Sequence, residues 1–560
     1  MTQAFDVAIV GGGFGGLTLA RDLILHVPDI RVVVIEKKKE FATPKHHKVG
    51  ETSLVPQAIY LAERLQLKEY LEQHHLEKFG ARYFFKNHKH DFESRPEMGA
   101  NSYGGAPEYQ MDRTRLEADL FSMNQQDGVE FLLDTQVLNL KLSIDENPHV
   151  LQLEQDGDAV ELKADWVIDA SGRRRLLPSS LGQKKGDKGP CSAAWMRVEG
   201  WIDIDSFASS SQSDWHDRID STHPRAQDFR RIYSTNHLVG EGYWVWLIPL
   251  TDDVMSIGIV SHEEHVPFEQ LNQKEKALHW LSEHEPHLAE QLREKTITQF
   301  RVMRNYSYAP AQFVSENRWF CIGESLGFAD PLYASSGMMM TVQNLLAVET
   351  IQRYKREEHL DGERVQAMNA YVSSHLGITT EQLHSLYPLF GYSRIAASHI
   401  LWDMASLVSF HRTVIPKFDE GIYDFLSSKT SSQLLVQLHE LNQSINHSLT
   451  KWARSTSTPQ QSRYLSDCQM FNQYTGVRSL MMSGMMQPMV MMVFGLGYLL
   501  CLLGFKSSGT KLLAHSYMQS LRRISKGLQG YIRAMTSTPD GQSPRLSGMA
   551  RPWGRLLGTK

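Results

Sequence analysis

The sequence predicts an α/β fold, and three observations carry that prediction. A strand, a glycine-rich loop, a helix and a second strand follow one another over residues 5–36. Two later segments, 164–172 and 319–331, each read as a buried strand that ends in a turn of small residues. Beyond residue 350 the pattern becomes helical. Together these features predict a Rossmann-like domain with an interleaved β-sheet and a mainly helical C-terminal region.

The glycine-rich loop carries the first chemical signal. Gly11 permits a tight turn, Gly13 lets a pyrophosphate approach the backbone, and Gly16 lets the helix pack on the sheet. Glu36 ends the second strand about 20 residues on, where a carboxylate can accept a hydrogen bond from a ribose hydroxyl. The order predicts a dinucleotide site, and the alternative is a glycine turn in an ordinary βαβ unit. The residues assigned to the cofactor here are Gly11, Gly13, Phe14, Gly15, Gly16, Glu36 and Lys37.

The two later strand–turn segments favour FAD as the dinucleotide. With them the chain resembles the FAD-dependent aromatic hydroxylases and halogenases, in which a late Gly-Asp turn holds the cofactor. Gly323-Glu324 stands at that place here, and residues 110–113 resemble the family's segment whose arginine lies along the cofactor. The alternative for Arg113 is a surface arginine on a helix that starts after Asp112. The resemblance adds the cofactor residues Gly50, Arg113, Gly323, Glu324, Asp330, Gly337 and Met338.

Composition bounds the class of protein. The 560 residues are 41% hydrophobic and 22% charged, so the chain can bury a large core in two or three domains. The net charge is −5, and the sequence contains no basic stripe, which argues against nucleic-acid binding. The four cysteines lack CxxC spacing and fit a reducing cytoplasm. The first strand begins almost at the N-terminus, so we expect no signal peptide and a cytoplasmic protein, either free or peripheral to the inner membrane.

Paired histidines near residues 46, 74 and 88 suggest a metal site at first sight. None has HExxH or similar spacing that would place ligands on one helix face. We therefore expect no metal, and expect these histidines to be solvated or to face substrate.

Residues 242–249 contain alternating aromatic residues typical of a strand. Trp244 and Trp246 share one face of that strand. The segment resembles the GWxWxIP signature of flavin-dependent halogenases, with Tyr243 where the family has another residue. The resemblance implies a cavity wall beside the flavin, and the alternative is an aromatic sheet face packed in a core. The predicted substrate-pocket residues are Trp244, Trp246, Ile248 and Pro249.

Lys78 precedes Phe79-Gly80 and is the candidate catalytic residue. Halogenases acting on phenols and pyrroles carry a lysine in this context, and residues 49–56 resemble their GE…P loop with one extra residue. The resemblance implies that a flavin C4a-hydroperoxide is attacked by halide to give hypohalous acid, which the lysine delivers to the substrate. A lysine suits the role because its ammonium is a mobile donor. The alternative is an exposed lysine at a helix end.

The halide site of that family lies on backbone amides in an Asp-Pro…Ser-Gly segment. Residues 330–337 match it with one residue more, and three methionines follow. Ser336 and Gly337 are the predicted halide residues. An insertion here displaces the amides, and small misplacements are costly in catalysis.

The organisation along the chain follows from these motifs. Residues 1–175 form the first part of an FAD-binding domain, 176–310 a substrate-binding sheet, and 311–350 a return to the FAD domain. Strands are predicted over 193–204, 242–250 and 254–260. Residues 351–535 form the helical region, with amphipathic stretches at 363–375 and 433–448, and residues 536–560 read as a disordered tail.

Residues 488–505 form an uncharged apolar run in the helical region. Its length is at the lower limit for a membrane span, and basic residues follow it. The run predicts a buried helical hairpin over a hydrophobic substrate tunnel or an interfacial segment, with a true membrane span as the alternative and a membrane surface as a candidate partner.

The sequence as a whole predicts an FAD-dependent halogenase-like oxidoreductase. No second GxGxxG motif follows a strand, so reduced flavin is expected from a separate reductase. The substrate is expected to be hydrophobic, either aromatic or tethered to a carrier protein. The alternatives are a flavin monooxygenase or dehydrogenase without halide chemistry, and a membrane-associated redox-sensing flavoprotein.

Overall fold

A computed structural model describes residues 3–41, 48–87, 91–99, 108–183, 189–216, 230–357 and 359–393, and shorter stretches between 395 and 454. The apolar run at 488–505 and the tail at 536–560 lie outside these residues. Within the part of the chain that the structure describes, no helix is long and apolar enough to cross a membrane.

The first sheet is built around the N-terminal strand. Its order is β16-β17-β10-β1-β2-β7, and β1 pairs in parallel with β2 and β10. The antiparallel strands β8 and β9 extend from β10. The bounds are β1 Gln3–Val10, β2 Val32–Ile35, β7 Glu130–Leu132, β8 Thr135–Lys141, β9 His149–Gln155, β10 Asp158–Asp169, β16 Val314–Ser315 and β17 Trp319–Cys321. Strands from distant parts of the sequence therefore meet in one sheet.

The second sheet is antiparallel apart from one strand pair. Its order is β15-β11-β14-β13-β12-β4-β5, with β12 and β4 parallel. Its bounds are β4 Ala81–Phe85, β5 Glu97–Gly99, β11 Cys191–Glu199, β12 Thr235–Gly240, β13 Tyr243–Leu250, β14 Val254–His262 and β15 Ile297–Met303. The strand predicted over 193–204 thus ends at Glu199, and Ile204–Phe207 form a 3₁₀ turn. A two-stranded ribbon, β3 (Leu76–Glu77) with β6 (Tyr109–Gln110), lies apart from both sheets.

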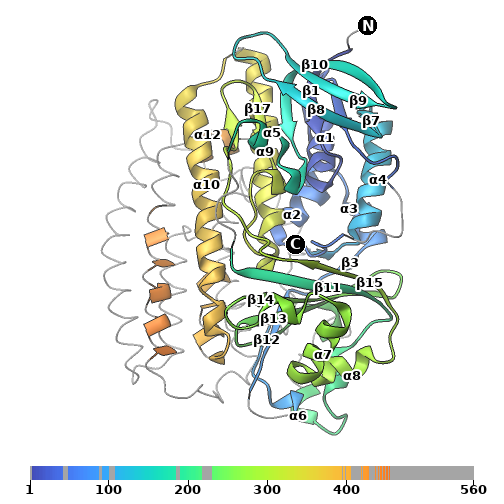
Figure 1. Cartoon of the computed structure of the whole chain (residues 1–560), viewed down its shortest axis with the longest axis vertical. Coiled ribbons are helices and arrows are strands. Elements are labelled where there is room, and N and C mark those ends of the chain that lie inside the picture. Colours follow the sequence, from blue (N-terminus) through green and yellow to red (C-terminus); the bar gives the residue numbers. More distant parts are fainter. Residues whose placement is uncertain are drawn as a thin grey trace, which may run out of the picture.

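Helices cover the sheets and connect them (Figure 1). Helix α10 runs beside both sheets, which places residues after it next to the second sheet. Helices α7 and α8 cover the face of the second sheet that points away from α10. With both faces covered, every residue of β13 is buried. The bounds are α1 Phe14–His26, α2 Val55–Ile59, α3 Lys68–His74, α4 Arg113–Gln126, α5 Leu176–Ser180, α6 Ser213–His216, α7 Lys274–His284, α8 Pro286–Leu292, α9 Ser335–Glu357, α10 Gly362–His384 and α12 Ile422–Leu426.

Local chemistry explains where the main helices begin. Asp112 caps α4, accepting hydrogen bonds from the backbone N–H of Thr114 (2.8 Å) and Arg115 (3.4 Å). Asp361 caps α10 in the same way. The start of α9 is less regular, because Tyr333 (φ 66°) and Ala334 (φ 53°) adopt left-handed conformations directly before it. Two successive non-glycine residues in that region store strain of about 1–2 kcal/mol each.

Candidate active site

A cavity of about 760 Å³ lies between the two sheets and brings the sequence-predicted motifs together. Its wall is formed by the start of α1, the loop at 48–52, α2, the segment at 78–81, the inner faces of β11, β12 and β13, the turn at 322–324, and the loop into α9. These segments come from widely separated parts of the chain. The site is thus assembled only by the tertiary fold.

The glycine loop contributes one edge of this cavity. Gly13, Phe14 and Gly15 line it, and a Cβ placed on Gly13 meets no atom within 4 Å. The other two key glycines are required by packing. A Cβ on Gly11 would lie 2.4 Å from the Ala170 carbonyl oxygen, and one on Gly16 would lie 2.1 Å from the Gly11 carbonyl oxygen. Only Gly13 therefore offers free space in front of the helix N-terminus.

Glu36 is oriented by the same loop. Its carboxylate accepts hydrogen bonds from the backbone N–H of Gly12 (2.8 Å) and Lys38 (3.1 Å). Neither Glu36 nor Lys37 is among the described residues that line the cavity. A Cβ on Gly12 would lie 2.6 Å from the ring of Phe41, so this ring packs beside Glu36.

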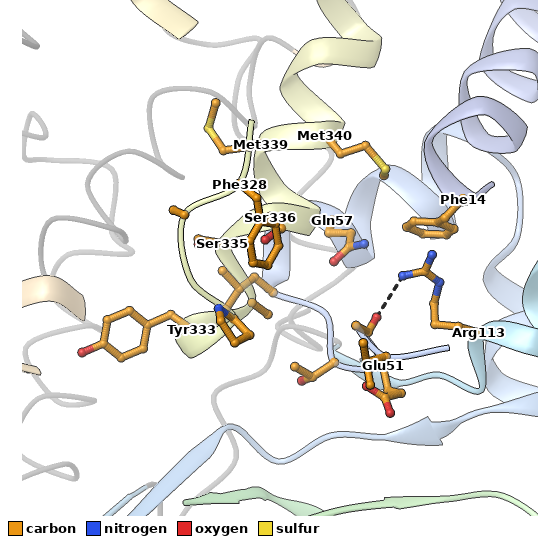
Figure 2. A pocket seen from close by; sticks show the side chains of 18 of the residues that line it. Phe14, Glu51, Gln57, Arg113, Phe328, Tyr333, Ser335, Ser336, Met339 and Met340 are labelled. Carbon is orange, nitrogen blue, oxygen red and sulfur yellow. Dashed lines mark hydrogen bonds between the residues drawn. The ribbon is translucent and has the colours of Figure 1, made fainter. Parts of the chain in front are cut away.

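Arg113 lies inside the site rather than on the surface (Figure 2). Its guanidinium lies 4.0 Å from the ring centre of Phe14, donates to the Gly50 carbonyl oxygen at 3.2 Å, and pairs with Glu117 at 2.8 Å. Lys48 pairs with the same Glu117, and burial lowers the pKa of Lys48. The helix start predicted after Asp112 is confirmed, whereas the surface alternative for Arg113 is excluded.

The turn at Gly323-Glu324 forms another edge of the cavity. Gly323 has φ of +59°, and its N–H donates to Gln343 Oε1 at 2.7 Å. Glu324 lines the cavity, and its carboxylate pairs with the Arg173 guanidinium at 3.2 Å. Both side chains are partly exposed. The longer acid at this place is therefore held toward the cavity rim by an arginine.

These residues fit a dinucleotide such as FAD. The N-terminus of α1 supplies a positive helix end, Gly13 leaves room before it, and Arg113 adds a fixed charge. Arg113 Nε and Gln57 Oε1 are buried without a hydrogen-bond partner among the described residues. Unpartnered buried polar atoms at a cavity wall are expected where a ligand completes their hydrogen bonds.

Alternation along β13 decides which tryptophan-motif residues reach the cavity. Trp244, Trp246 and Ile248 line it, with the two indole centres 5.8 Å apart. Trp246 Nε1 donates to Ser256 Oγ at 3.0 Å, which fixes that ring. Pro249 directly follows Ile248, so alternation places it on the other face of the strand, and it does not line the cavity.

Lys78 is buried in the cavity wall, with 4% of its surface exposed. Its ammonium donates to the Ser53 carbonyl oxygen at 2.7 Å and pairs with Glu108 Oε2 at 3.0 Å. Lys78 follows β3 directly, and its backbone N–H donates to the Glu108 carbonyl oxygen at 2.8 Å. The alternative of an exposed helix-end lysine is therefore excluded.

The predicted halide segment also reaches the cavity. Ser335, Ser336 and Gly337 line it, and a Cβ on Gly337 would lie 2.1 Å from Gln57 Oε1. The left-handed pair at Tyr333 and Ala334 lies directly before these residues, and the Tyr333 ring turns away from Phe14 (Figure 2).

Two predicted cofactor residues in this segment lie behind the cavity lining. The Asp330 carboxylate is buried and accepts hydrogen bonds from Tyr306 (2.5 Å), Tyr387 (2.8 Å) and the Leu332 N–H (2.9 Å). Met338 packs within α9, while its neighbours Met339 and Met340 line the cavity.

Sequence reasoning missed three residues of the site. Glu108 is the partner of Lys78, Tyr387 supports Trp244, and His237 lines the cavity from β12. For Glu108 and Tyr387 the sequence holds no signal, because the partner of each lies in a distant segment of the chain. For His237 a signal existed in the alternation of residues 235–239.

The prediction that the paired histidines are solvated or face substrate is wrong for His75. His75 is buried outside the cavity lining, and burial lowers its pKa to about 4, so it neither faces solvent nor lines the site. His46, His47, His88 and His90 lie outside the described residues. Cys191, Asp330 and His384 place one ligand atom each within 4.8 Å of one another, as do His262, Glu264 and His265.

The comparisons with known proteins follow this geometry. The tryptophan halogenase family profile matches residues 85–389, more than half of the chain. The flavin-dependent halogenase chlA of Dictyostelium discoideum is 26% identical over 380 residues, covering 63% of this chain and 60% of that protein. The 1H-pyrrole-2-carbonyl-[peptidyl-carrier protein] chlorinase of Pseudomonas fluorescens is 25% identical, covering 59% of this chain and 72% of that protein. The chain thus spans less than two thirds of the first of these relatives.

The solved structures agree on the fold. Halogenase PltM in complex with phloroglucinol and FAD has a TM-score of 0.65 at 15% identity, covering 80% of this chain and 94% of that one. The myxobacterial chondrochloren halogenase CndH has a TM-score of 0.54 at 19% identity, covering 69% and 82%. These structures confirm the predicted α/β fold, and the family profile confirms the predicted family.

Proposed function

The chain belongs to the tryptophan halogenase family, and on that premise we propose that it is an FAD-dependent halogenase of a hydrophobic aromatic substrate, free or tethered to a carrier protein. The observation that carries the proposal is the convergence of three features on one cavity. Gly13, Lys78 and Gly337 all line it, although they come from three segments that lie far apart in the sequence. A packed core has no need of a buried lysine there.

The chain's own residues divide the work. Gly13, the α1 N-terminus and Arg113 hold FAD, and Ser336 with Gly337 offers backbone amides to a halide. When bound in reduced form, supplied by a separate reductase, FAD provides the electrons with which O₂ and halide give hypohalous acid. All other steps belong to side chains of the protein.

Lys78 is proposed to hold the hypohalous acid near the substrate. Its ammonium has three N–H donors, of which two face Ser53 and Glu108. These partners fix the side chain and leave the third donor for an oxygen or halogen atom. The Trp244 and Trp246 rings in the same cavity wall favour a flat, apolar substrate.

The relatives support both substrate forms. One curated relative acts on a pyrrole carried by a peptidyl-carrier protein, and the complex with phloroglucinol contains a free phenol. We include both classes in the proposal, with a flavin reductase as the partner that supplies reduced FAD.

A second candidate function is monooxygenation without halide. The observation that favours it is the left-handed pair at Tyr333 and Ala334, which reshapes the approach to Ser336. In that case the cavity binds FAD and an aromatic substrate but no halide.

Mass spectrometry separates the two functions. The holoenzyme is incubated with FAD, a flavin reductase, NADH and bromide, together with a panel of phenols and free or carrier-tethered pyrroles. Products showing the bromine isotope doublet only when bromide is present support the halogenase. Products with one added oxygen that form equally without halide support the monooxygenase, and a reaction that yields neither kind of product contradicts both functions.

A further inference from the structure

His237 lies in the cavity wall formed by β12. Thr235 and His237 are two residues apart and so lie on the same face of the strand, and both line the cavity. The imidazole stacks on the Tyr83 ring at 4.6 Å and 14°, and its centre lies 5.4 Å from the Trp244 ring. Only 4% of the residue is exposed. The ring is therefore held rigidly beside the space that an aromatic substrate occupies in the proposed function.

The hydrogen bond of His237 fixes which nitrogen carries the proton. Nδ1 lies 3.0 Å from the Arg82 carbonyl oxygen, which can only accept. Nδ1 is therefore the donor, and Nε2 carries the lone pair of the neutral ring. Burial, together with the nearby Lys78 ammonium, lowers the pKa of His237 to about 4, against a smaller opposing effect of the Arg82 and Thr235 carbonyls. At neutral pH the ring is an uncharged proton acceptor.

The carboxylates in the described cavity lining are already paired with cations. The four carboxylates each face a cation: Glu51 with Arg197, Glu108 with Lys78, Glu117 with Arg113 and Lys48, and Glu324 with Arg173. Taking a proton would cost each of them its ion pair. His237 can accept a proton without breaking one.

Electrophilic halogenation needs such a group. When hypohalous acid transfers its halogen, the halogen–oxygen bond breaks, a carbon–halogen bond forms, and the oxygen leaves as hydroxide. The ring must then release the proton of the substituted carbon to regain its aromatic electron pair. That proton and the hydroxide together make one water, so an aromatic C–H and HOX give C–X and H₂O.

We propose that His237 is the catalytic base of this reaction, its Nε2 taking the proton from the substituted carbon. The inference rests on the proposed function and names a further catalytic residue for it. Lys78 and His237 then act in sequence, Lys78 holding the halogen donor and His237 removing the proton.

The test compares three single variants of the holoenzyme. His237→Phe keeps a stacking ring and removes the acceptor, and His237→Ala opens a space for added imidazole. The control is His284→Phe, because His284 also stacks on an aromatic ring (Trp280, 4.3 Å) and also places Nδ1 near a carbonyl (2.9 Å), but lies outside the cavity lining. FAD uptake reports that each variant is folded.

The readouts separate proton removal from the earlier steps. For His237→Phe we expect product formation to fall about 100-fold or more, while hypohalous acid trapped with taurine stays at the wild-type level. A primary deuterium isotope effect at the substituted carbon should appear, and imidazole should restore His237→Ala. Should His237→Phe fail to take up FAD, the imidazole titration of His237→Ala decides, and activity independent of imidazole overturns the proposal.

The proposal and the proposed function can fail separately. Wild-type halogenation with unchanged product formation in His237→Phe overturns the base alone, as does a loss of trapped hypohalous acid equal to the loss of product. A wild type that makes neither hypohalous acid nor halogenated product overturns both.

Independently of turnover, ¹⁵N NMR of histidine-labelled protein should show His237 neutral and protonated at Nδ1, and protonation at Nε2 contradicts the assignment.

Discussion

Trp244 donates a hydrogen bond from Nε1 to the hydroxyl of Tyr387, 2.9 Å away. The same hydroxyl donates to Asp330 Oδ2 at 2.8 Å. One buried tyrosine thus connects the tryptophan wall of the cavity with the turn that leads to Ser336 and Gly337. Tyr387 follows α10, so the helical region takes part in shaping the site.

Removing this hydroxyl should loosen the wall. Tyr387→Phe leaves Trp244 Nε1 without its acceptor and Asp330 with one donor fewer, which should cost about 1–3 kcal/mol of stability. The control is Tyr83→Phe, because the buried Tyr83 hydroxyl has no hydrogen-bond partner among the described residues. Thermal unfolding should show a lower Tm for Tyr387→Phe only, and equal Tm changes in the two variants would contradict the role given to the network.

The open space before Gly13 predicts a selective loss of cofactor. Gly13 has φ of −83°, which any residue can adopt, so Gly13→Val should fold normally. Its side chain would occupy the pyrophosphate space, and FAD uptake should fall at least 100-fold. Absorbance at 450 nm after gel filtration measures it. The matched control is Gly377→Ala, where a Cβ also meets nothing within 4 Å but lies in α10. Full FAD affinity in Gly13→Val would contradict the predicted binding mode.

The ion pair of Lys78 predicts a split between oxidant formation and its use. Lys78→Ala should bind FAD and reoxidise reduced flavin at the wild-type rate, yet lose halogenated product, because only delivery requires the ammonium. Lys86→Ala is the control, since Lys86 is a half-buried lysine that donates to the His284 carbonyl at 2.9 Å outside the cavity lining. Halogenation retained in Lys78→Ala removes Lys78 from the mechanism. Oxygen insertion that persists in its place indicates the monooxygenase.

Buried neutral histidines predict acid sensitivity. Burial lowers the pKa of His75, His149 and His237 to about 4 each, against an ordinary value near 6.5. Between these values the unfolded chain binds more protons than the folded one, so stability should fall as pH drops from 6.5 to 4. Tm measured over that range checks it. His149→Gln should lower Tm at pH 7, where it loses hydrogen bonds, but should flatten the dependence below pH 6.5; an unchanged slope would contradict the prediction.

The sequence by itself determined the parts of the fold that short-range patterns encode. The strand, turn and helix at 7–26 need glycine at 11 and 16 because a Cβ there would touch backbone atoms, and that need is visible in the residue order. Alternation placed Trp244 and Trp246 on one face of β13, and a capping residue placed the start of α4. Each of these signals is contained in one short segment, so the chain can be read for them directly.

Only the tertiary structure decided which candidates meet in the cavity. Pro249 and Met338 stand next to lining residues in their motifs but do not line the cavity themselves. Their positions along the strand and the helix direct their side chains away from it. Glu108 and Tyr387 belong to the site through contacts with Lys78 and Trp244, which no local pattern specifies. Burial of Lys78 follows from the packing of the 78–81 segment between two sheets, and a side chain's exposure depends on what the rest of the chain places over it.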